Sequence, residues 1–184
     1  MPKHEKSQER YQIEEKPDEK ELKAREVLST FSNKFSFGRV TIKNVGALRV
    51  LNSTCLPVHY RNWFYDGIFD REEKYARIVS FNDILVGGVV FNKDDVSSYY
   101  IMSFSVLKQF RRCKIGTYLM NYVLNVAKDD PAIKRIHLNV HVINKSAIDF
   151  YMNAFGFVQK KRIEKYYKTL KPSSCYELEK EITH

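Results

Sequence analysis

The sequence contains few of the residues that cross-link small extracellular domains or carry a chain through a membrane. Only three of its 184 residues are cysteine, at positions 55, 113 and 175, and their spacing matches no metal-ligand motif. Three scattered thiols suit a reducing compartment. No run of about 18 apolar residues is present, and the N-terminus lacks the apolar core of a secretory signal. We therefore expect a soluble protein without a metal site or membrane segment, located in the cytoplasm, with the nucleus as the alternative compartment.

Glycine is scarce as well. The seven glycines form no loop that combines two glycines with a Lys-Ser/Thr pair, which excludes the common phosphate-binding loop of nucleotide hydrolases. The chain contains no internal repeat. A hydrophobic content of 43% is enough, at this length, for one globular domain with its own core.

Charge is distributed unevenly along the chain. The formal net charge is +9, yet residues 1–30 hold seven basic and eight acidic side chains. We expect residues 1–36 to form a charged extension, partly disordered or helical, and residues 37–184 to form the folded domain. The basic excess lies in this domain, which suits a polyanionic ligand or docking on RNA. Composition does not decide between these two.

Hydrophobic periodicity predicts an α/β fold with a mixed sheet. The expected strands cover residues 39–45, 74–80, 84–91, 99–107, 135–143 and 158–170. The expected helices cover residues 46–55, 60–69, 115–128 and 144–155. The strands before residue 107 form an antiparallel meander, whereas the strand that follows the third helix is expected to pair in parallel. Gly87 and Gly88 mark a bulge or a close packing contact.

The most informative stretch is Tyr99–Lys128, in which a strand leads through a basic loop into a helix. A helix N-terminus exposes unpaired N–H groups and the positive end of the peptide dipoles, so it attracts phosphate. Arg111, Arg112 and Lys114 add full positive charges beside it. Gly116 lets the backbone approach a ligand closely. We interpret this loop as a phosphate cradle, and the alternative is a solvated cluster of surface charge.

The same loop carries a family resemblance. Arg111–Thr117 is similar to the acyl-CoA pyrophosphate loop of the GNAT acetyltransferases, whose pattern is Arg/Gln-x-x-Gly-x-Gly/Ala, although Lys114 stands where the first glycine belongs. Further motifs resemble this family, and within it the NatE-type N-alpha-acetyltransferases: Leu56–Tyr60, Tyr99–Met102, Asn144–Tyr151, Phe155–Phe157 and Tyr166–Tyr167. The resemblance covers residues 37–170.

The resemblance implies a GNAT acyl-CoA N-acyltransferase fold, with a mixed, mostly antiparallel central sheet that contains a splayed parallel pair and is flanked by helices. It implies acetyl-CoA as the acetyl donor and a peptide or protein N-terminus as the acceptor. The residues assigned to acetyl-CoA are Phe104, Ser105, Val106, Arg111, Arg112, Cys113, Lys114, Ile115, Gly116, Thr117, Asn144 and Tyr151. The residues assigned to the peptide are Leu56, Pro57, Val58, Tyr60, Met102, Tyr166 and Tyr167.

The catalytic assignments also follow from the resemblance. Tyr100 matches the catalytic tyrosine of the family and is expected to order a water that receives the proton, but the catalytic histidine falls on Asn139, which cannot accept one. His141 or His137, two residues to either side on the same strand face, is the candidate replacement, and otherwise both are half-exposed strand histidines. Tyr151 is assigned as general acid or CoA-positioning residue, although periodicity alone fits a core aromatic equally well.

The substrate amine decides how strong a base the site needs. A peptide α-amine has a pKa of about 7.7 to 8.0, so roughly a quarter of it is neutral near pH 7.4, whereas only about 0.1% of a lysine amine is neutral. A site with a weak base therefore favours a protein N-terminus over a lysine. We expect direct transfer of acetyl to N-termini that begin with Met followed by an apolar residue.

Two other functions stay open. Acetylation of lysine side chains predicts a well-placed carboxylate base, and no acidic residue falls on the strands expected around the thioester. The other function is a catalytically silent module that docks on RNA or the ribosome, which predicts salt-sensitive RNA binding without CoA affinity. Docking and catalysis are compatible, because the NatE type can associate with an N-terminal acetyltransferase complex at the ribosome.

Overall fold

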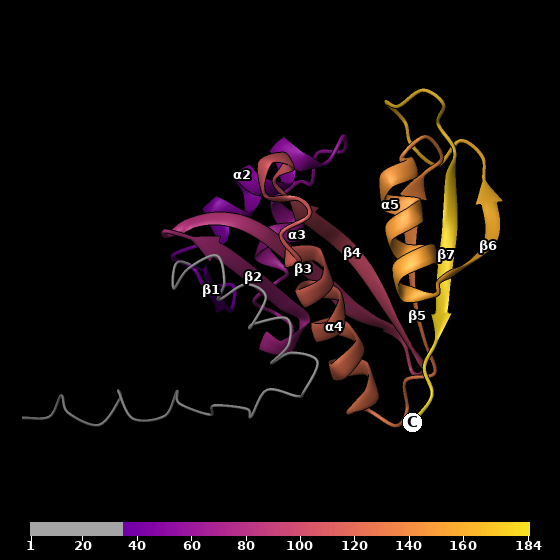
Figure 1. Ribbon diagram of the computed structural model, residues 1–184, viewed down its shortest axis with the longest axis horizontal. Coiled ribbons are helices and arrows are strands. Elements are labelled where there is room, and N and C mark those ends of the chain that lie inside the picture. The colour runs from indigo at the N-terminus through magenta and orange to yellow at the C-terminus, as the bar shows by residue number, and fades with distance from the viewer. Residues whose placement is uncertain (1–34) are drawn as a thin grey trace, which may run out of the picture.

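The computed structural model describes residues 35–184, which form one seven-stranded sheet in the order β1-β2-β3-β4-β5-β7-β6 (Figure 1). The strands are β1 Phe35–Gly38, β2 Ala76–Phe81, β3 Ile84–Asp95, β4 Ser98–Val106, β5 Arg135–His141, β6 Val158–Ile163 and β7 Cys175–Glu181. All neighbouring strands are antiparallel except β4 and β5. This confirms the expected mixed, mostly antiparallel sheet. Of the expected extension 1–36, all but Phe35 and Ser36 lies outside the described residues.

Helices cover both faces of this sheet. They are α2 Val45–Cys55, α3 Asn62–Asp66, α4 Ile115–Lys128 and α5 Lys145–Asp149, with a π-helical turn at Phe150–Ala154 and 3-10 turns at Glu73–Tyr75 and Lys108–Phe110. Residues of β3 contribute to two core clusters, one on each face of the sheet. Val86 and Val89 pack in the cluster that contains α4, whereas Leu85 and Val90 pack in the cluster that contains α2 and α3. The sheet therefore separates these two groups of helices.

The parallel strands β4 and β5 pair over only three residues each. Ser98–Tyr100 lie opposite Arg135–His137, and no pairing follows although both strands continue. Just beyond lies a bulge at Met102, which has no partner residue on β3. Because a bulge bends its strand and increases the local twist, β4 turns away from β5. In Figure 1 the two strands meet near the C-terminus and diverge toward the opposite end, as the expected splayed pair requires.

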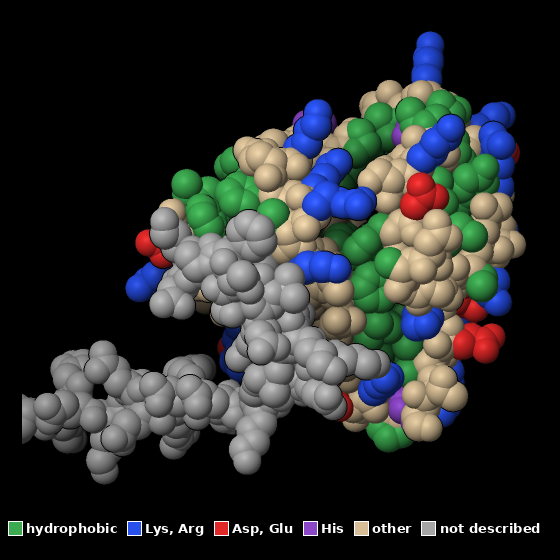
Figure 2. All heavy atoms as spheres, in the orientation of Figure 1, with side chains coloured by type: hydrophobic (Ala, Val, Ile, Leu, Met, Phe, Trp, Pro, Cys, Tyr) green, Lys and Arg blue, Asp and Glu red, His purple; other side chains and the backbone are tan. Residues whose placement is uncertain are grey.

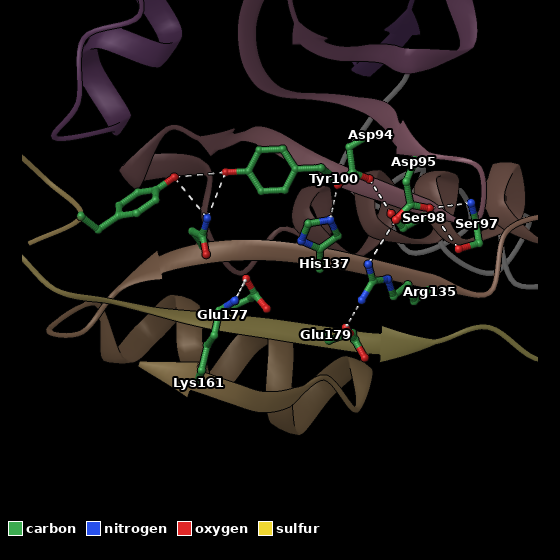
Figure 3. A network of polar contacts seen from close by, with 12 residues as sticks. Asp94, Asp95, Ser97, Ser98, Tyr100, Arg135, His137, Lys161, Glu177 and Glu179 are labelled. Atoms are coloured by element: carbon green, nitrogen blue, oxygen red, sulfur yellow. Dashed lines mark hydrogen bonds and ion pairs between the residues drawn. The ribbon is translucent and has the colours of Figure 1, made fainter. Parts of the chain in front are cut away.

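A network of ion pairs, which we call the Arg135 clamp, holds the closed end of the splayed pair (Figure 3). The Arg135 guanidinium lies 3.2 Å from Asp95, in the last residues of β3, and 3.1 Å from Glu179 on β7. The neighbouring Asp94 lies 2.7 Å from His137 Nε2 on β5. The clamp therefore ties the end of β3 to both β5 and β7.

The strand predicted at residues 39–45 is wrong. β1 ends at Gly38, and Asn44 closes a turn with its side chain, which accepts a hydrogen bond from the Thr41 N–H at 2.7 Å and donates one to the Arg39 carbonyl at 3.0 Å. Local bonds of this kind compete with the hydrogen bonds of a strand. The apolar alternation after Gly38 therefore leads into α2 instead of forming a strand.

The single strand predicted at residues 158–170 is also wrong. β6 ends at Ile163, and a further strand, β7, follows after a loop and lies between β5 and β6. β7 is not among the predicted strands, although Tyr176, Leu178 and Ile182 alternate with glutamates at positions 177, 179 and 181 as in a half-buried strand. The helix expected at residues 60–69 is shorter than predicted, since α3 ends at Asp66.

Gly87 and Gly88 mark close packing contacts, and the register between β2 and β3 also shifts beside Gly87. A Cβ atom on Gly87 would lie 2.6 Å from Ile115 Cγ2 on α4, and one on Gly88 would lie 2.9 Å from Leu48 Cδ1 on α2. Without these side chains, helices on opposite faces both approach β3 closely.

Gly87→Ala is expected to lower the free energy of unfolding by about 1–3 kcal/mol, because the added methyl group overpacks the contact with α4. Equilibrium urea denaturation measures this change. Gly46→Ala is the matched control, since nothing lies within 4 Å of a Cβ at that position and alanine favours a helix. A similar loss of stability in both variants would contradict the packing explanation.

Candidate active site

A cavity of about 110 Å³ opens where β4 and β5 diverge. Its lining comes from the loop between α2 and α3, from β4 and β5, from the region of α5 and from the loop between β6 and β7. The predicted site residues that line it are Leu56, Pro57, Val58, Tyr60, Met102, Phe104, His141, Asn144, Tyr151 and Tyr167. On the face in Figure 2, Lys and Arg side chains gather around a hollow between the start of α4 and α5. Segments far apart in the sequence thus form one site.

Three polar side chains meet beside this cavity, and we call them the Tyr100 triangle: Tyr100 from β4, Asn139 from β5 and Tyr166 from the β6–β7 loop. Asn139 Nδ2 donates to the Tyr166 hydroxyl at 3.1 Å and to the Tyr100 hydroxyl at 3.4 Å, and the two hydroxyls lie 3.4 Å apart. Burial, with a smaller effect of the Tyr166 hydroxyl, raises the pKa of Tyr100. The Tyr100 hydroxyl is therefore neutral and acts as a hydrogen-bonding group.

The two candidate histidines are held in different ways. His141 is buried and lines the cavity, where its Nε2 donates to the Pro172 carbonyl at 2.6 Å and its ring packs edge-on against Tyr167. In a neutral imidazole this bond leaves Nδ1 as the proton acceptor. His137 Nε2 instead faces Asp94, and His137 is not among the residues that line the cavity. His141 is therefore the better placed of the two.

One wall of the cavity is apolar. Leu56, Pro57 and Val58 form it at the bend that follows α2. Tyr60 fixes this bend to β4, because its hydroxyl donates to the Met102 carbonyl at 2.6 Å. Met102 is the bulged residue, and the bulge that separates the strands thus also anchors the wall.

Tyr151 lies within the π-helical turn that follows α5 and is buried against aromatic rings. Its ring centroid is 5.9 Å from that of Phe104 and 5.6 Å from that of Phe157, in edge-on geometry. Burial raises the pKa of the Tyr151 hydroxyl, which therefore stays protonated at neutral pH. The residue is both a core aromatic, as periodicity allows, and part of the cavity lining.

The basic loop has the geometry of an anion site. Arg112 and Lys114 have left-handed backbone conformations, with φ of 67° and 62°. Lys114 directly precedes α4, and no side chain caps the N-terminus of this helix. The left-handed conformation explains the usual glycine at this position, since an L-residue adopts it at a cost of about 1–2 kcal/mol. Uncapped N–H groups, the helix dipole and the cations of the loop together fit the pyrophosphate of acetyl-CoA.

Of the other residues predicted to bind CoA, some lie beside the cavity or the basic loop, whereas others have side chains buried in the core. Phe104 packs near Tyr151, and Asn144 caps α5 by accepting a hydrogen bond at 3.3 Å from the Ala147 N–H. The Ser105 hydroxyl faces the interior, where it donates to Asn52 Oδ1 at 2.8 Å. Ile115 is likewise buried, whereas the side chains of Val106, Cys113 and Thr117 are partly buried beside the loop. Because the side chains of Ser105 and Ile115 face the interior, these two residues can contact a ligand only through their backbone.

Two acidic residues beside the site are not predicted, because they lie on β7, which is not among the predicted strands. In the pairing of β5 with β7, Glu177 lies opposite Asn139 and Glu179 lies opposite His137, so each pair shares one face of the sheet. The expectation that no acidic residue lies on the surrounding strands is therefore wrong. Each carboxylate forms an ion pair with a basic side chain of β6, at 3.3 Å for Glu177 and 3.1 Å for Glu179.

Residues 35–184 contain no group of three or more His, Cys, Asp or Glu side chains that could hold a metal ion. Within the same range, no helix is both long and apolar enough to cross a membrane. The three cysteines are free thiols.

A sheet that opens between two parallel strands, with an uncapped helix N-terminus and a basic loop at the opening, defines an acyl-CoA-dependent N-acyltransferase. The sequence profile of the acetyltransferase (GNAT) family matches residues 46–157. The chain belongs to this family of acetyl-CoA-dependent enzymes, as its motifs indicated.

Individual relatives agree with this assignment. The chain is 36% identical to N-alpha-acetyltransferase 50 from Danio rerio over 152 residues, which cover 81% of the chain and 89% of the relative. It is 34% identical to the probable N-acetyltransferase san from Drosophila melanogaster, with 79% of each covered. A solved structure of Arabidopsis thaliana Naa50 in complex with the bisubstrate analogue CoA-Ac-MVNAL is 32% identical, with a TM-score of 0.71 and coverage of 80% of this chain and 98% of that chain. The resemblance to the NatE type is thus confirmed.

Tyr100→Phe is expected to lower kcat by about 10- to 100-fold, because it removes the hydroxyl of the Tyr100 triangle and keeps the ring. CoA-induced thermal stabilisation should not change, since the basic loop is untouched. Steady-state kinetics and differential scanning fluorimetry measure the two effects. Tyr99→Phe is the control, because Tyr99 is fully buried in the core. An unchanged kcat in Tyr100→Phe would remove this hydroxyl from the mechanism.

Lys114→Gly and Lys114→Ala separate the charge of Lys114 from its backbone strain. Both remove one cation, but only glycine adopts the left-handed conformation without strain. The glycine variant should therefore unfold with a free energy about 1 kcal/mol higher than the alanine variant. Calorimetric titration with CoA should give the same loss of affinity in both, as expected for a purely electrostatic contact. Equal stability of the two variants would argue against a strained Lys114.

Proposed function

We propose that this protein is an N-alpha-acetyltransferase, which moves acetyl from acetyl-CoA to the α-amine of protein N-termini that begin with Met followed by an apolar residue. The observation that carries the proposal is the cavity between β4 and β5, which has an apolar wall on one side and the Tyr100 triangle beside it. The apolar side chain of an N-terminal Met can pack against this wall, and its α-amine can form a hydrogen bond with the Tyr100 triangle. Both curated relatives are named as N-acetyltransferases, and the ligand of the Arabidopsis thaliana protein joins CoA to the peptide MVNAL.

When bound, acetyl-CoA supplies an acetyl thioester, which an amine can attack directly. The chain contributes the binding and the proton transfers. Arg111, Arg112 and Lys114 hold phosphate at the start of α4. Tyr100 orients the amine or a water beside it by a hydrogen bond, and Asn139 fixes that hydroxyl. The hydroxyl of Tyr151, which stays protonated at neutral pH, would donate its proton to the leaving group, the CoA thiolate.

His141 is the residue that we assign to proton acceptance. Its Nε2 is committed to the Pro172 carbonyl, so Nδ1 takes the proton that the substrate amine loses. A weakly basic imidazole is enough for an α-amine, because roughly a quarter of it is already neutral near pH 7.4. A lysine amine would need about 3 to 4 kcal/mol more for deprotonation.

Glu177 gives lysine acetylation one observation in its favour, because this carboxylate lies across the sheet from Asn139. This carboxylate is, however, already engaged in an ion pair with Lys161 at 3.3 Å. Lysine acetylation is therefore the second candidate. Association with an N-terminal acetyltransferase complex or with the ribosome stays a prediction that follows from the resemblance.

Incubation of the protein with acetyl-CoA and a Met-Leu peptide that carries one internal lysine tests the proposal. Fragment mass spectrometry locates the acetyl group, which we expect on the α-amine. The matched control is the same peptide with a blocked α-amine, which should stay unmodified.

Acetyl on the internal lysine would establish the second candidate. In that case Glu177→Gln should remove the lysine product, because it removes the carboxylate and keeps the side-chain size. If neither amine is modified and CoA gives no thermal stabilisation, the protein is a binding module with an acetyltransferase fold.

A further inference from the structure

The β6–β7 loop carries lysines that have no ion-pair partner within residues 35–184. Lys165, Lys168 and Lys171 are all exposed. The basic residues of the preceding strand differ, since Lys160, Lys161 and Arg162 pair with glutamates at 3.1, 3.3 and 2.6 Å. The charge of β6 is therefore compensated, whereas that of the loop is not.

Each of the three lysines lies next to a residue that is fixed to the site. Lys165 precedes Tyr166, whose hydroxyl belongs to the Tyr100 triangle, and Lys168 follows Tyr167, which lines the cavity. Lys171 precedes Pro172, whose carbonyl accepts the hydrogen bond from His141. The Tyr167 N–H also bonds to the Ser173 carbonyl at 2.8 Å, which draws the two arms of the loop together. The backbone that carries the three lysines is therefore anchored beside the cavity.

The opposite lip of the cavity mouth carries a cation as well. Arg61 is exposed and follows Tyr60, which lines the cavity from the loop after α2. In Figure 1 this loop and the β6–β7 loop lie at the same end of the molecule, where the splayed strands are open. We call Lys165, Lys168 and Lys171, together with Arg61, the cationic rim.

We propose that the cationic rim selects N-termini that carry acidic side chains at about the third to fifth positions. This inference rests on the proposed function. An extended peptide advances about 3.3 Å per residue, so those positions lie roughly 7 to 14 Å from an α-amine held at the Tyr100 triangle. At that distance the chain leaves the cavity between the two lips of the rim. Carboxylates there form exposed ion pairs with lysines that otherwise have none in the described part of the chain.

The arrangement favours a short acidic peptide over a nucleic acid. A phosphate backbone is bound through a patch or stripe that contacts many phosphates, commonly six to ten of them. Here glutamates neutralise the neighbouring basic strand, so the β6–β7 loop contributes only three lysines without an ion-pair partner in the described part of the chain. A local cluster of this size matches two or three carboxylates.

The test compares three peptides of equal length that start with Met-Leu and continue with three Glu, three Gln or three Lys residues. KM should be about tenfold lower for the Glu peptide than for the Gln peptide, as three exposed ion pairs would give, and highest for the Lys peptide. Raising the salt concentration from about 50 to 500 mM should remove the difference, because it screens exposed charges. Equal KM values for the Glu and Gln peptides at low salt would overturn the proposal.

A triple variant, Lys165→Gln with Lys168→Gln and Lys171→Gln, should lose the preference and keep the kcat/KM of the Gln peptide. The matched control replaces Lys43, Lys128 and Lys134, which are exposed and lie outside the rim, with glutamine. This control changes the net charge equally and should keep the preference. A preference that survives in the rim variant, or disappears in the control, would assign it to the overall field of the protein.

Two further measurements complete the test. A short single-stranded RNA should not inhibit acetylation of the Gln peptide, and inhibition that the rim variant relieves would assign the rim to phosphate and overturn the proposal. Calorimetric titration measures the affinity of each of the three peptides and therefore tests the rim even if no peptide is acetylated. If the Gln peptide is not acetylated on its α-amine, the proposed function fails, whereas tighter binding of the Glu peptide would still support the rim.

Discussion

The site depends on the point at which β4 and β5 stop sharing backbone hydrogen bonds. Three residues of each strand pair, and the bulge at Met102 then turns β4 away. Backbone groups that leave a ladder need other partners. The Met102 carbonyl finds one in the Tyr60 hydroxyl, which positions the apolar wall. One irregularity in one strand thus creates the opening and fixes one side of it.

Much of the fold follows from local patterns in the sequence. α4 begins and ends at the predicted residues, 115 and 128, because its apolar stripe is regular and a left-handed residue precedes it. β5 alternates strictly and is found as predicted, two residues shorter at its end. β7 is not among the predicted strands, although its apolar residues alternate with glutamates. What the sequence does not reveal is that cations on β5 and β6, distant along the chain, hold these glutamates. The strand predicted at residues 39–45 does not form because the side chain of Asn44 closes a turn there.

The candidate site shows the same limit. Motifs predict which residues line the cavity, since Leu56, Tyr151 and Tyr167 all do so. They do not predict how His141 and His137 differ, because a carbonyl of the β6–β7 loop orients one and a carboxylate near the end of β3 orients the other. Nor do they give the orientation of Ser105, whose hydroxyl is bound by Asn52 in the core. Orientation is set by partners that only the folded chain brings together.

The Arg135 clamp has a mechanical consequence for the open end of the sheet. From Tyr100 to Val106, β4 and its antiparallel partner β3 run together for about 20 Å as one arm beyond the last bond between β4 and β5. A rotation of only about 5° at the clamped end moves the far end of that arm by about 2 Å, and a misplacement of about 1 Å can cost 100-fold in rate. The accuracy with which the two lips face each other is therefore set by ion pairs at the opposite end of the strands. The residues of the Arg135 clamp therefore control the geometry of the site although they do not contact the substrate.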